Sequence, residues 1–305
     1  MFESCTEPAI PDQQSYAAAF SDLDDEASRE HIRRPTLSTT SVRVGASNKF
    51  LDLWYVDLDV AADAVTFFSH WLSDDELAKA TRFHSDLHRA RYIAGRAALR
   101  RVLAERLDCS PAVIRFSYGR NGKPMLESGQ GHIEFNLAHS EGNAVIALVD
   151  GASVGVDIEL PRPIAGVESL AHLVFSDVER RELELAPDPV SGFLNGWTRK
   201  EAYVKALGLG LTAPLREITV SLSDRPELFS TGFRDQPVSQ WRLLSVPHPR
   251  AVVALALGST APGRHERGLW TASKYVARSS AAFCDGRRTR TPSCPSEVCQ
   301  LYKGL

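Results

Sequence analysis

Two carboxylates stand close together in residues 154–160, which read VGVDIEL. The alternating pattern predicts a strand, in which residues two apart point to the same face, so Asp157 and Glu159 would share one face. Neighbouring carboxylates raise each other's pKa unless a cation lies between them. Oxygen ligands of this kind suit Mg²⁺, which commonly takes one or two carboxylates together with substrate phosphate oxygens. The open alternative is an acidic strand edge that only faces water.

A second candidate set lies in the segment WTRKEAYVK at residues 197–205. On a helix, Trp197, Glu201 and Lys205 are four residues apart and share one face. Glu201 and Lys205 could form an ordinary exposed ion pair, or they could face a ligand. The glycine-rich exit ALGLGL could be a plain helix C-cap or could allow a ligand to approach the backbone closely.

Three further segments carry basic side chains that could contact phosphate. NLAHS places His139 beside Ser140 at the end of a predicted strand, but without the G-x-S-x-G elbow of a nucleophilic serine. His139 is therefore a candidate phosphate contact or a hydrogen-bonded structural histidine. The turn NGKP presents Lys123, which could also be merely solvated. Arg91 belongs to an arginine-rich predicted helix whose charges could simply face water.

The elements that must position these residues follow from periodicity and capping. Ser73 with Glu76 three residues later is a capping box and predicts a helix from residue 74. The other predicted helices are 88–107, 169–185 and 193–211, and the predicted strands are 51–60, 112–119, 132–140, 144–150, 153–160, 217–222, 240–247 and 251–257. Helices followed by strands, twice over, predict an α+β fold of two similar subdomains, with helices packed on antiparallel-type sheets.

Differences in amino-acid composition along the chain predict the domain limits. We expect an N-terminal subdomain at 49–150 and a C-terminal subdomain at 151–258, where the apolar signal is dense. Residues 1–48 are polar and are expected to form a flexible leader. Residues 259–305 hold eight Lys or Arg against three Asp or Glu and are expected to form a disordered, low-complexity basic tail.

Composition excludes several classes of protein. The 305 residues carry a formal net charge of −3, which gives no general attraction to nucleic acid or to a membrane surface. No apolar run approaches the roughly 18 residues that span a bilayer, and the N-terminus lacks the pattern of a secretory signal. Five irregularly placed cysteines make neither a disulfide framework nor a zinc site. We therefore expect a reduced, cytoplasmic protein.

The order and spacing of the motifs resemble those of the Sfp-type 4′-phosphopantetheinyl transferases. That family is marked by GxDxE in a strand and WxxKExxxK in a helix, and this chain has GVDIE at 155–159 and WTRKEAYVK at 197–205. It also has GKP at 122–124 and NLAHS at 136–140, where the family commonly has GKP and NxSHS. The resemblance covers roughly residues 50–258, and it departs from the family at Ala138, where a serine is common.

The resemblance implies a pseudo-dimeric fold, with coenzyme A and Mg²⁺ bound between two lobes. By position, Asp157, Glu159 and Glu201 would hold Mg²⁺. Glu201 is also the candidate acceptor of the proton from a carrier-protein serine. The catalytic candidates are therefore Glu201 and Lys205.

The coenzyme A contacts implied by position are Arg91, Lys123, His139 and Lys205, and Lys79 and Arg96 are further candidates. If Lys205 serves the ligand, Lys205→Ala should leave the stability of the unliganded protein little changed.

The implied reaction transfers the 4′-phosphopantetheine of coenzyme A to a serine of an apo acyl, aryl or peptidyl carrier protein and releases adenosine 3′,5′-bisphosphate. No nucleic acid or membrane is implied, and we expect a monomer. The resemblance does not indicate whether fatty-acid, polyketide or non-ribosomal peptide synthesis is served. Two alternatives stay open: a non-catalytic module that binds coenzyme A or a carrier protein, and a Mg²⁺-dependent phosphohydrolase.

Overall fold

The computed structural model describes residues 37–44 and 49–258 of the chain. Its strands are β1 (Leu37–Val44), β2 (Lys49–Asp57), β3 (Phe116–Tyr118), β4 (Pro124–Leu126), β5 (Ile133–Ser140), β6 (Asn143–Asp150), β7 (Val154–Glu159), β8 (Ile218–Val220), β9 (Leu228–Thr231), β10 (Trp241–Ser245) and β11 (Val252–Gly258). Its α-helices are α2 (Ala62–Ser69), α3 (Asp74–Ala80), α4 (Asp86–Leu107), α5 (Val167–Val174), α6 (Asp177–Glu184) and α7 (Pro189–Leu207).

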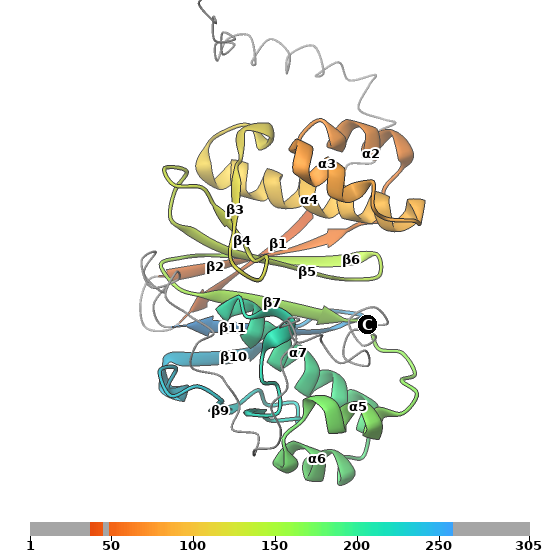
Figure 1. Ribbon diagram of the computed structural model, residues 1–305, viewed down its shortest axis with the longest axis vertical. Coiled ribbons are helices and arrows are strands. Elements are labelled where there is room, and N and C mark those ends of the chain that lie inside the picture. Colours follow the sequence, from red (N-terminus) through yellow and green to blue (C-terminus); the bar gives the residue numbers. More distant parts are fainter. Residues whose placement is uncertain (1–36, 45–48, 259–305) are drawn as a thin grey trace, which may run out of the picture.

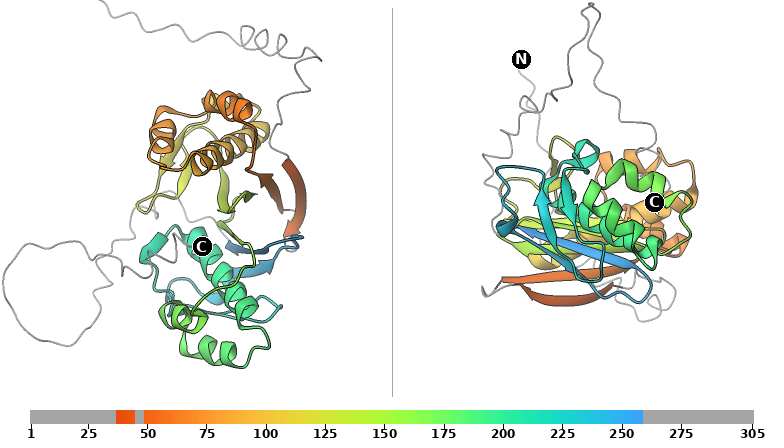
Figure 2. Two further views of the ribbon diagram at one scale, coloured as in Figure 1. Left: turned by 90° about the vertical axis from the view of Figure 1, so that its right-hand side faces the viewer. Right: turned by 90° about the horizontal axis from the view of Figure 1, so that it is seen from below.

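Two antiparallel sheets stack face to face, with helices on the outer side of each (Figure 1). The first sheet has the order β1-β2-β6-β5 and lies beneath α2, α3 and α4. The second has the order β10-β11-β7 and is covered by α7, with α5 and α6 further out. Figure 2 shows the same two lobes from the side and from below. The predicted α+β fold is confirmed.

The two lobes repeat one topology. In the N-terminal lobe, β2 is followed by helices and then by β5 and β6, and β6 lies between the other two strands. In the C-terminal lobe, β7 is followed by helices and then, after β8 and β9, by β10 and β11, and β11 lies between β10 and β7. In each lobe the last strand returns to the middle, so the two subdomains are similar, as the sequence predicted.

The central strands are buried on both faces because both lobes share the space between the sheets. Along β6, Val145, Ala147 and Val149 point into the core between the sheets, where β7 and β11 contribute alternate residues. The intervening side chains of β6, such as Ile146, pack beneath α4 instead. A strand covered on both sides reads as a continuous apolar run, as AVIALV does here.

Helix termini follow the expected capping chemistry. Ser73 and Glu76 form the predicted capping box of α3. Asp188 caps the N-terminus of α7, which starts with Pro189 and ends at Gly208 in the left-handed conformation (φ 69°). The helix thus ends at the glycines, as predicted.

The helix α2 and the strands β4 and β9 were not predicted, and three further segments differ from the prediction. Residues 37–44, expected to belong to the flexible leader, form β1 and pair with β2 along its whole length. The predicted helix at 169–185 is two helices, because Phe175 leaves the helical path to enter the core and Ser176 caps α6 in a box with Glu179. The predicted strand at 112–119 becomes a strand only at Phe116.

Other expectations for the two ends of the chain lie outside the described residues. These are the leader up to residue 36 and the basic tail at 259–305. Within 37–44 and 49–258, no helix is long and apolar enough to cross a membrane.

Candidate active site

Gly155 brings the two chemical motifs together, because it lets α7 lie directly on β7. A Cβ atom at this position would stand 2.0 Å from the carbonyl oxygen of Ala202 and 2.3 Å from the amide nitrogen of Ala206. Any side chain would therefore push the helix away from the strand. With no side chain between the two elements, Glu201 and Lys205 on the helix come close to the acids of β7. Figure 1 shows α7 directly below β7.

The acidic face of β7 is buried and contacts a lysine. Lys205 Nζ donates a hydrogen bond to Asp157 Oδ1. The other carboxylate oxygen of Asp157, Oδ2, is buried and accepts no hydrogen bond from the described residues. Burial raises the pKa of Asp157 above its ordinary value, against the opposing effect of Lys205. A buried carboxylate oxygen without a donor is an acceptor that a cation would satisfy.

Glu159 is buried two residues along the same face, as predicted. Its Oε2 accepts a hydrogen bond of 3.1 Å from the hydroxyl of Ser140. Burial, and next the charge of Asp157, raise the pKa of Glu159 to about 7. In the unliganded protein, this carboxylate is therefore only partly ionised near neutral pH.

Glu201 completes the acidic group from the helix. It is buried, one turn before Lys205. Burial alone would lower the pKa of Lys205, but Asp157, Glu201 and Glu159 together raise it. The ammonium of Lys205 thus interacts with all three acids, and 30% of the surface of its side chain is exposed.

The donor set fits Mg²⁺ chemically, since it offers carboxylate oxygens of which one is buried and without a partner. In the part of the chain that the structure describes, no three His, Cys, Asp or Glu side chains converge closely enough to hold a metal as they stand. The ammonium of Lys205 pairs with Asp157, and the charges of Arg162 and Lys205 both act on Glu159.

His139 lies at the end of β5, exposed, with basic groups around it. Although part of the His139 side chain reaches the surface, the protein atoms packed around the ring shield it from water and lower its pKa, and the charges of Lys205, Arg91 and Lys79 lower it further. Arg91 is held by two acids: Nε donates to Asp59 at 2.6 Å, and Nη1 donates to Glu141 at 2.9 Å. The sequence did not suggest these acidic partners of Arg91.

Two other basic candidates have structural contacts. Lys123 Nζ donates to the backbone carbonyls of Val154 and Ala206 at 3.0 and 2.9 Å, which uses two of its three N–H donors. Arg96 is buried and pairs with Glu76, so it belongs to the packing of α3 on α4.

Lys200 of the helix motif is a structural residue. Its buried ammonium donates to Glu179 Oε2 at 2.6 Å and to the carbonyls of Val174 and Leu215 at 2.8 and 2.7 Å. Burial lowers the pKa of Lys200 to about 8 despite Glu179. Trp197 is also buried, in the core beneath α7. The motif therefore combines two residues that pack the helix into its own lobe, Trp197 and Lys200, with two that lie beside β7, Glu201 and Lys205.

The departure at Ala138 falls on a buried position. Ala138 packs in the core between the sheets, whereas the adjacent His139 is exposed. Asn136 and Ser140, on the same face as Ala138, bond to β7. The alternation of the strand could have identified this face, but nothing local indicated that β7 would lie against it.

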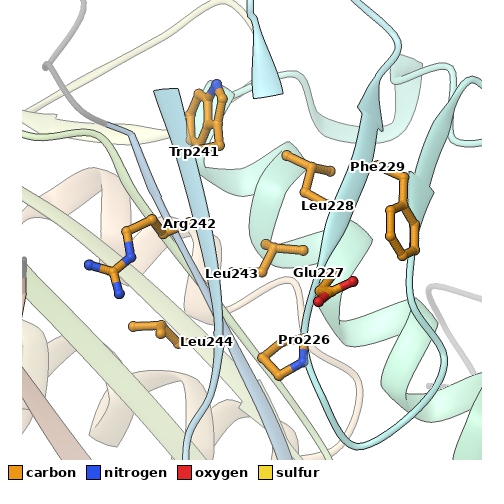
Figure 3. A pocket seen from close by; sticks show the side chains of 8 residues that line it. All are labelled: Pro226, Glu227, Leu228, Phe229, Trp241, Arg242, Leu243 and Leu244. Atoms are coloured by element: carbon orange, nitrogen blue, oxygen red, sulfur yellow. The ribbon is translucent and has the colours of Figure 1, made fainter. Parts of the chain in front are cut away.

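The described residues also line a pocket of about 370 Å³ elsewhere, between β9 and β10 (Figure 3). Its lining residues are Pro226, Glu227, Leu228, Phe229, Trp241, Arg242, Leu243 and Leu244. None of the residues predicted to do chemistry is among them, so the pocket is separate from the candidate active site.

Comparisons with known proteins agree with the motifs. The model of the 4′-phosphopantetheinyl transferase superfamily matches residues 153–256, which include both principal motifs. The chain is 37% identical over 213 residues to the 4′-phosphopantetheinyl transferase HetI of Nostoc sp., covering 67% of this chain and 86% of HetI. It is 33% identical to a putative 4′-phosphopantetheinyl transferase of Synechocystis sp., over 58% of this chain and 72% of that protein.

The packing of α7 on β7 and these similarities together identify the family of the chain. The chain belongs to the 4′-phosphopantetheinyl transferase superfamily. Within it, the chain is of the Sfp type, and it is 31% identical to the transferase Sfp of Bacillus subtilis over 55% of this chain and 74% of Sfp. The family predicted from the motifs is confirmed.

Proposed function

We propose that this protein transfers the 4′-phosphopantetheine of coenzyme A to a serine of an apo carrier protein. The observation that carries this proposal is the direct packing of α7 on β7 at Gly155, which joins the acids of one motif to the acid and lysine of the other. Membership in the family supports the same reaction.

The three acids would hold Mg²⁺ between the lobes, through Asp157, Glu159 and Glu201. When bound, the ion would neutralise the pyrophosphate of coenzyme A and stabilise the leaving adenosine 3′,5′-bisphosphate. The buried, unpartnered oxygen of Asp157 supports this assignment. The three acids extend from β7 and α7, two regular elements in backbone contact, so the backbone positions from which they would reach the ion are fixed before the substrate arrives.

The basic side chains would bind the phosphates of coenzyme A. Lys205 lies beside the acids and is partly exposed, so it can reach a phosphate oxygen if it leaves Asp157. His139 lies on the neighbouring lobe and would receive the 3′-phosphate, and Arg91, which is bonded to Asp59 and Glu141, would be a further coenzyme A contact. Lys123 is a remaining candidate with two donors already engaged.

The chemical step would be a displacement at the β-phosphate. The carrier serine oxygen forms a bond to the β-phosphorus, and the bond from that phosphorus to the bridging oxygen breaks, so adenosine 3′,5′-bisphosphate leaves with the electron pair. Glu201, or a water beside it, would accept the serine proton. The protein mainly positions the two substrates.

The test is to incubate the protein with coenzyme A, Mg²⁺ and an apo carrier protein. Mass spectrometry should show one phosphopantetheine added to the carrier. Binding of coenzyme A without transfer to any of a panel of carriers would indicate the non-catalytic module instead. Release of phosphate or nucleotide from coenzyme A in the absence of a carrier would indicate the phosphohydrolase.

The setting of the reaction belongs to the same proposal. An acidic carrier domain would be the protein partner, the enzyme would act as a monomer, and it would work in the cytoplasm. Gel filtration of the full chain, alone and with an apo carrier, would test the first two points.

A further inference from the structure

β5 and β7 lie against each other, but they are not neighbours in either sheet ladder. β7 is the last strand of its sheet, so backbone N–H groups on its free side need other acceptors. Side chains of β5 supply two of them. Asn136 Oδ1 accepts from the amide of Val156 at 2.9 Å, and Ser140 Oγ accepts from the amide of Leu160 at 3.3 Å.

Ser140 makes a second contact that Asn136 does not. Its hydroxyl donates to Glu159 Oε2 at 3.1 Å, and Ser140 is only 1% exposed. A serine hydroxyl has a single proton. Because its oxygen receives the amide of Leu160 from one side, the proton is directed to the carboxylate. The chain of bonds runs from the backbone of β7 through Ser140 to the side chain of Glu159.

A glutamate needs such a partner if it is to present its oxygens in one orientation. The last torsion of the glutamate side chain has a broad, roughly two-fold preference and does not fix the carboxylate by itself. A hydrogen bond from a buried hydroxyl that is itself held by a second hydrogen bond restricts that rotation. Groups that orient a ligand in this way affect metal affinity strongly.

We propose that Ser140 is a positioning residue that orients the Glu159 carboxylate for the cation of the active site. This inference rests on the proposed function, in which Glu159 is a ligand. It also divides the NLAHS motif into tasks. Asn136 and Ser140 hold β7, Ala138 packs between the sheets, and His139 alone turns outward.

The competing explanation is that Ser140 only joins the two strands. On that explanation its hydroxyl satisfies the amide of Leu160, and its loss would cost stability without a specific effect on metal binding. Ser221 provides the matched control. It is also a buried serine, and its hydroxyl accepts from the amide of Glu227 at 2.9 Å and from Arg199 Nη1 at 3.2 Å, and donates to the carbonyl of Arg225 at 2.7 Å. Among the described residues, the partners of its hydroxyl include none of the acids of β7.

The experiment measures Mn²⁺ binding to the full chain in the presence of coenzyme A and without a carrier, so that no turnover occurs. Electron paramagnetic resonance would count free Mn²⁺ for the wild type, Ser140→Ala, Ser140→Thr and Ser221→Ala. We expect Ser140→Ala to weaken Mn²⁺ binding by about tenfold. Ser140→Thr, which keeps the hydroxyl, should stay within about threefold of the wild type, and Ser221→Ala should bind as the wild type does.

Wild-type affinity in Ser140→Ala would overturn the inference, and so would equal losses in the alanine and threonine variants, since the hydroxyl would then not matter. If Ser140→Ala does not fold, Ser140→Cys replaces the strong donor by a weak one at similar volume and should show the same loss. Failure of the proposed function is a separate result: the wild type would then not modify an apo carrier at all.

Discussion

The two lobes have the same topology, but their buried acids differ in their partners and in the direction of their pKa shifts. In the N-terminal lobe, Glu76 is fully buried, and Arg100 Nε donates to it at 2.7 Å while Arg96 pairs with its other oxygen. Although burial opposes its charge, Arg96, the amide of Ser73 and Arg100 hold the pKa of Glu76 below its usual value. In the C-terminal lobe, the pKa of Glu159 is raised instead, to about 7.

Both acids are buried, so the difference between their pKa values comes from the charged and polar partners around each carboxylate. The C-terminal lobe also contains a compensated acid, since Glu179 is buried with the ammonium of Lys200. The acids of β7 stand apart from both because Asp157 pairs with a partly exposed lysine through one oxygen and keeps a second, buried oxygen without a hydrogen-bond partner among the described residues. Buried acids with complete partners hold elements together, whereas buried acids with too few partners indicate a site for a cationic ligand.

The largest expected effect concerns the compensated acid. Glu76→Gln should lower the free energy of unfolding by about 3–5 kcal/mol, because two buried guanidinium groups lose their counter-charge. Urea unfolding followed by circular dichroism measures this. Glu105→Gln is the control, since Glu105 forms an exposed pair with Arg101 and should cost no more than about 0.5 kcal/mol. A loss below 1 kcal/mol for Glu76→Gln would remove the contrast between the lobes.

Next comes the acid of β7 whose second carboxylate oxygen is buried without a hydrogen-bond partner in the described part of the chain. Asp157→Asn should reduce transfer to an apo carrier by at least about a hundredfold while the melting temperature changes little, because the side chain serves a ligand more than the fold. Initial rates by mass spectrometry provide the readout. Asp150→Asn, at the exposed end of β6, should behave as the wild type. Normal turnover by a folded Asp157→Asn protein would contradict the site assignment.

Lys205→Ala should reduce transfer or coenzyme A affinity by about ten- to a hundredfold through loss of a charge-assisted contact. From the sequence we expected little change in the stability of the unliganded protein, but the contact with buried Asp157 alters this expectation. The melting temperature should now fall, by an amount equivalent to about 1 kcal/mol, since Lys205 is partly exposed. Arg106→Ala, which breaks an exposed pair with Asp150, is the control and should change neither value.

The smallest effect is a pH dependence of stability from Glu159. Its pKa is raised in the folded state, so between the unfolded value and about 7 the native protein binds more protons than the unfolded chain. Stability from this group is therefore greatest at low pH and is lost as the pH rises toward 7. With EDTA present, the wild type should lose about 1–2 kcal/mol relative to Glu159→Gln between pH 5 and pH 7.5. Parallel profiles in urea titrations would contradict the raised pKa.

The parts of the fold that depend on local pattern could be predicted from the sequence. The alternation of VGVDIEL placed Asp157 and Glu159 on one face, and the capping box at Ser73 started α3. The break between α5 and α6 also had a local signal in Ser176 and Glu179, but the apolar periodicity across it favoured one helix.

What could not be predicted depends on contacts between distant residues. Lys200 lies in the predicted helix, but nothing local indicated that its buried ammonium would donate to Glu179 and to two backbone carbonyls. Arg91 read as part of a solvated face, yet it bonds to Asp59 and Glu141, which lie 32 and 50 residues away. Charge pairing of this kind is set by the packing of helices on sheets, and no local spacing encodes it.

Because of the backbone contact at Gly155, the active site cannot adjust to even a small substitution at this position. Where two elements meet through side chains, a substitution can be absorbed by another rotamer or by repacking. Here the helix backbone touches the strand backbone, so a single added methyl group has no rotamer that avoids Ala202 and Ala206. A mutation at a residue without functional groups would displace Glu201 and Lys205 together from Asp157. In a laboratory evolution experiment, Gly155 should therefore stay fixed even when selection acts only on carrier choice.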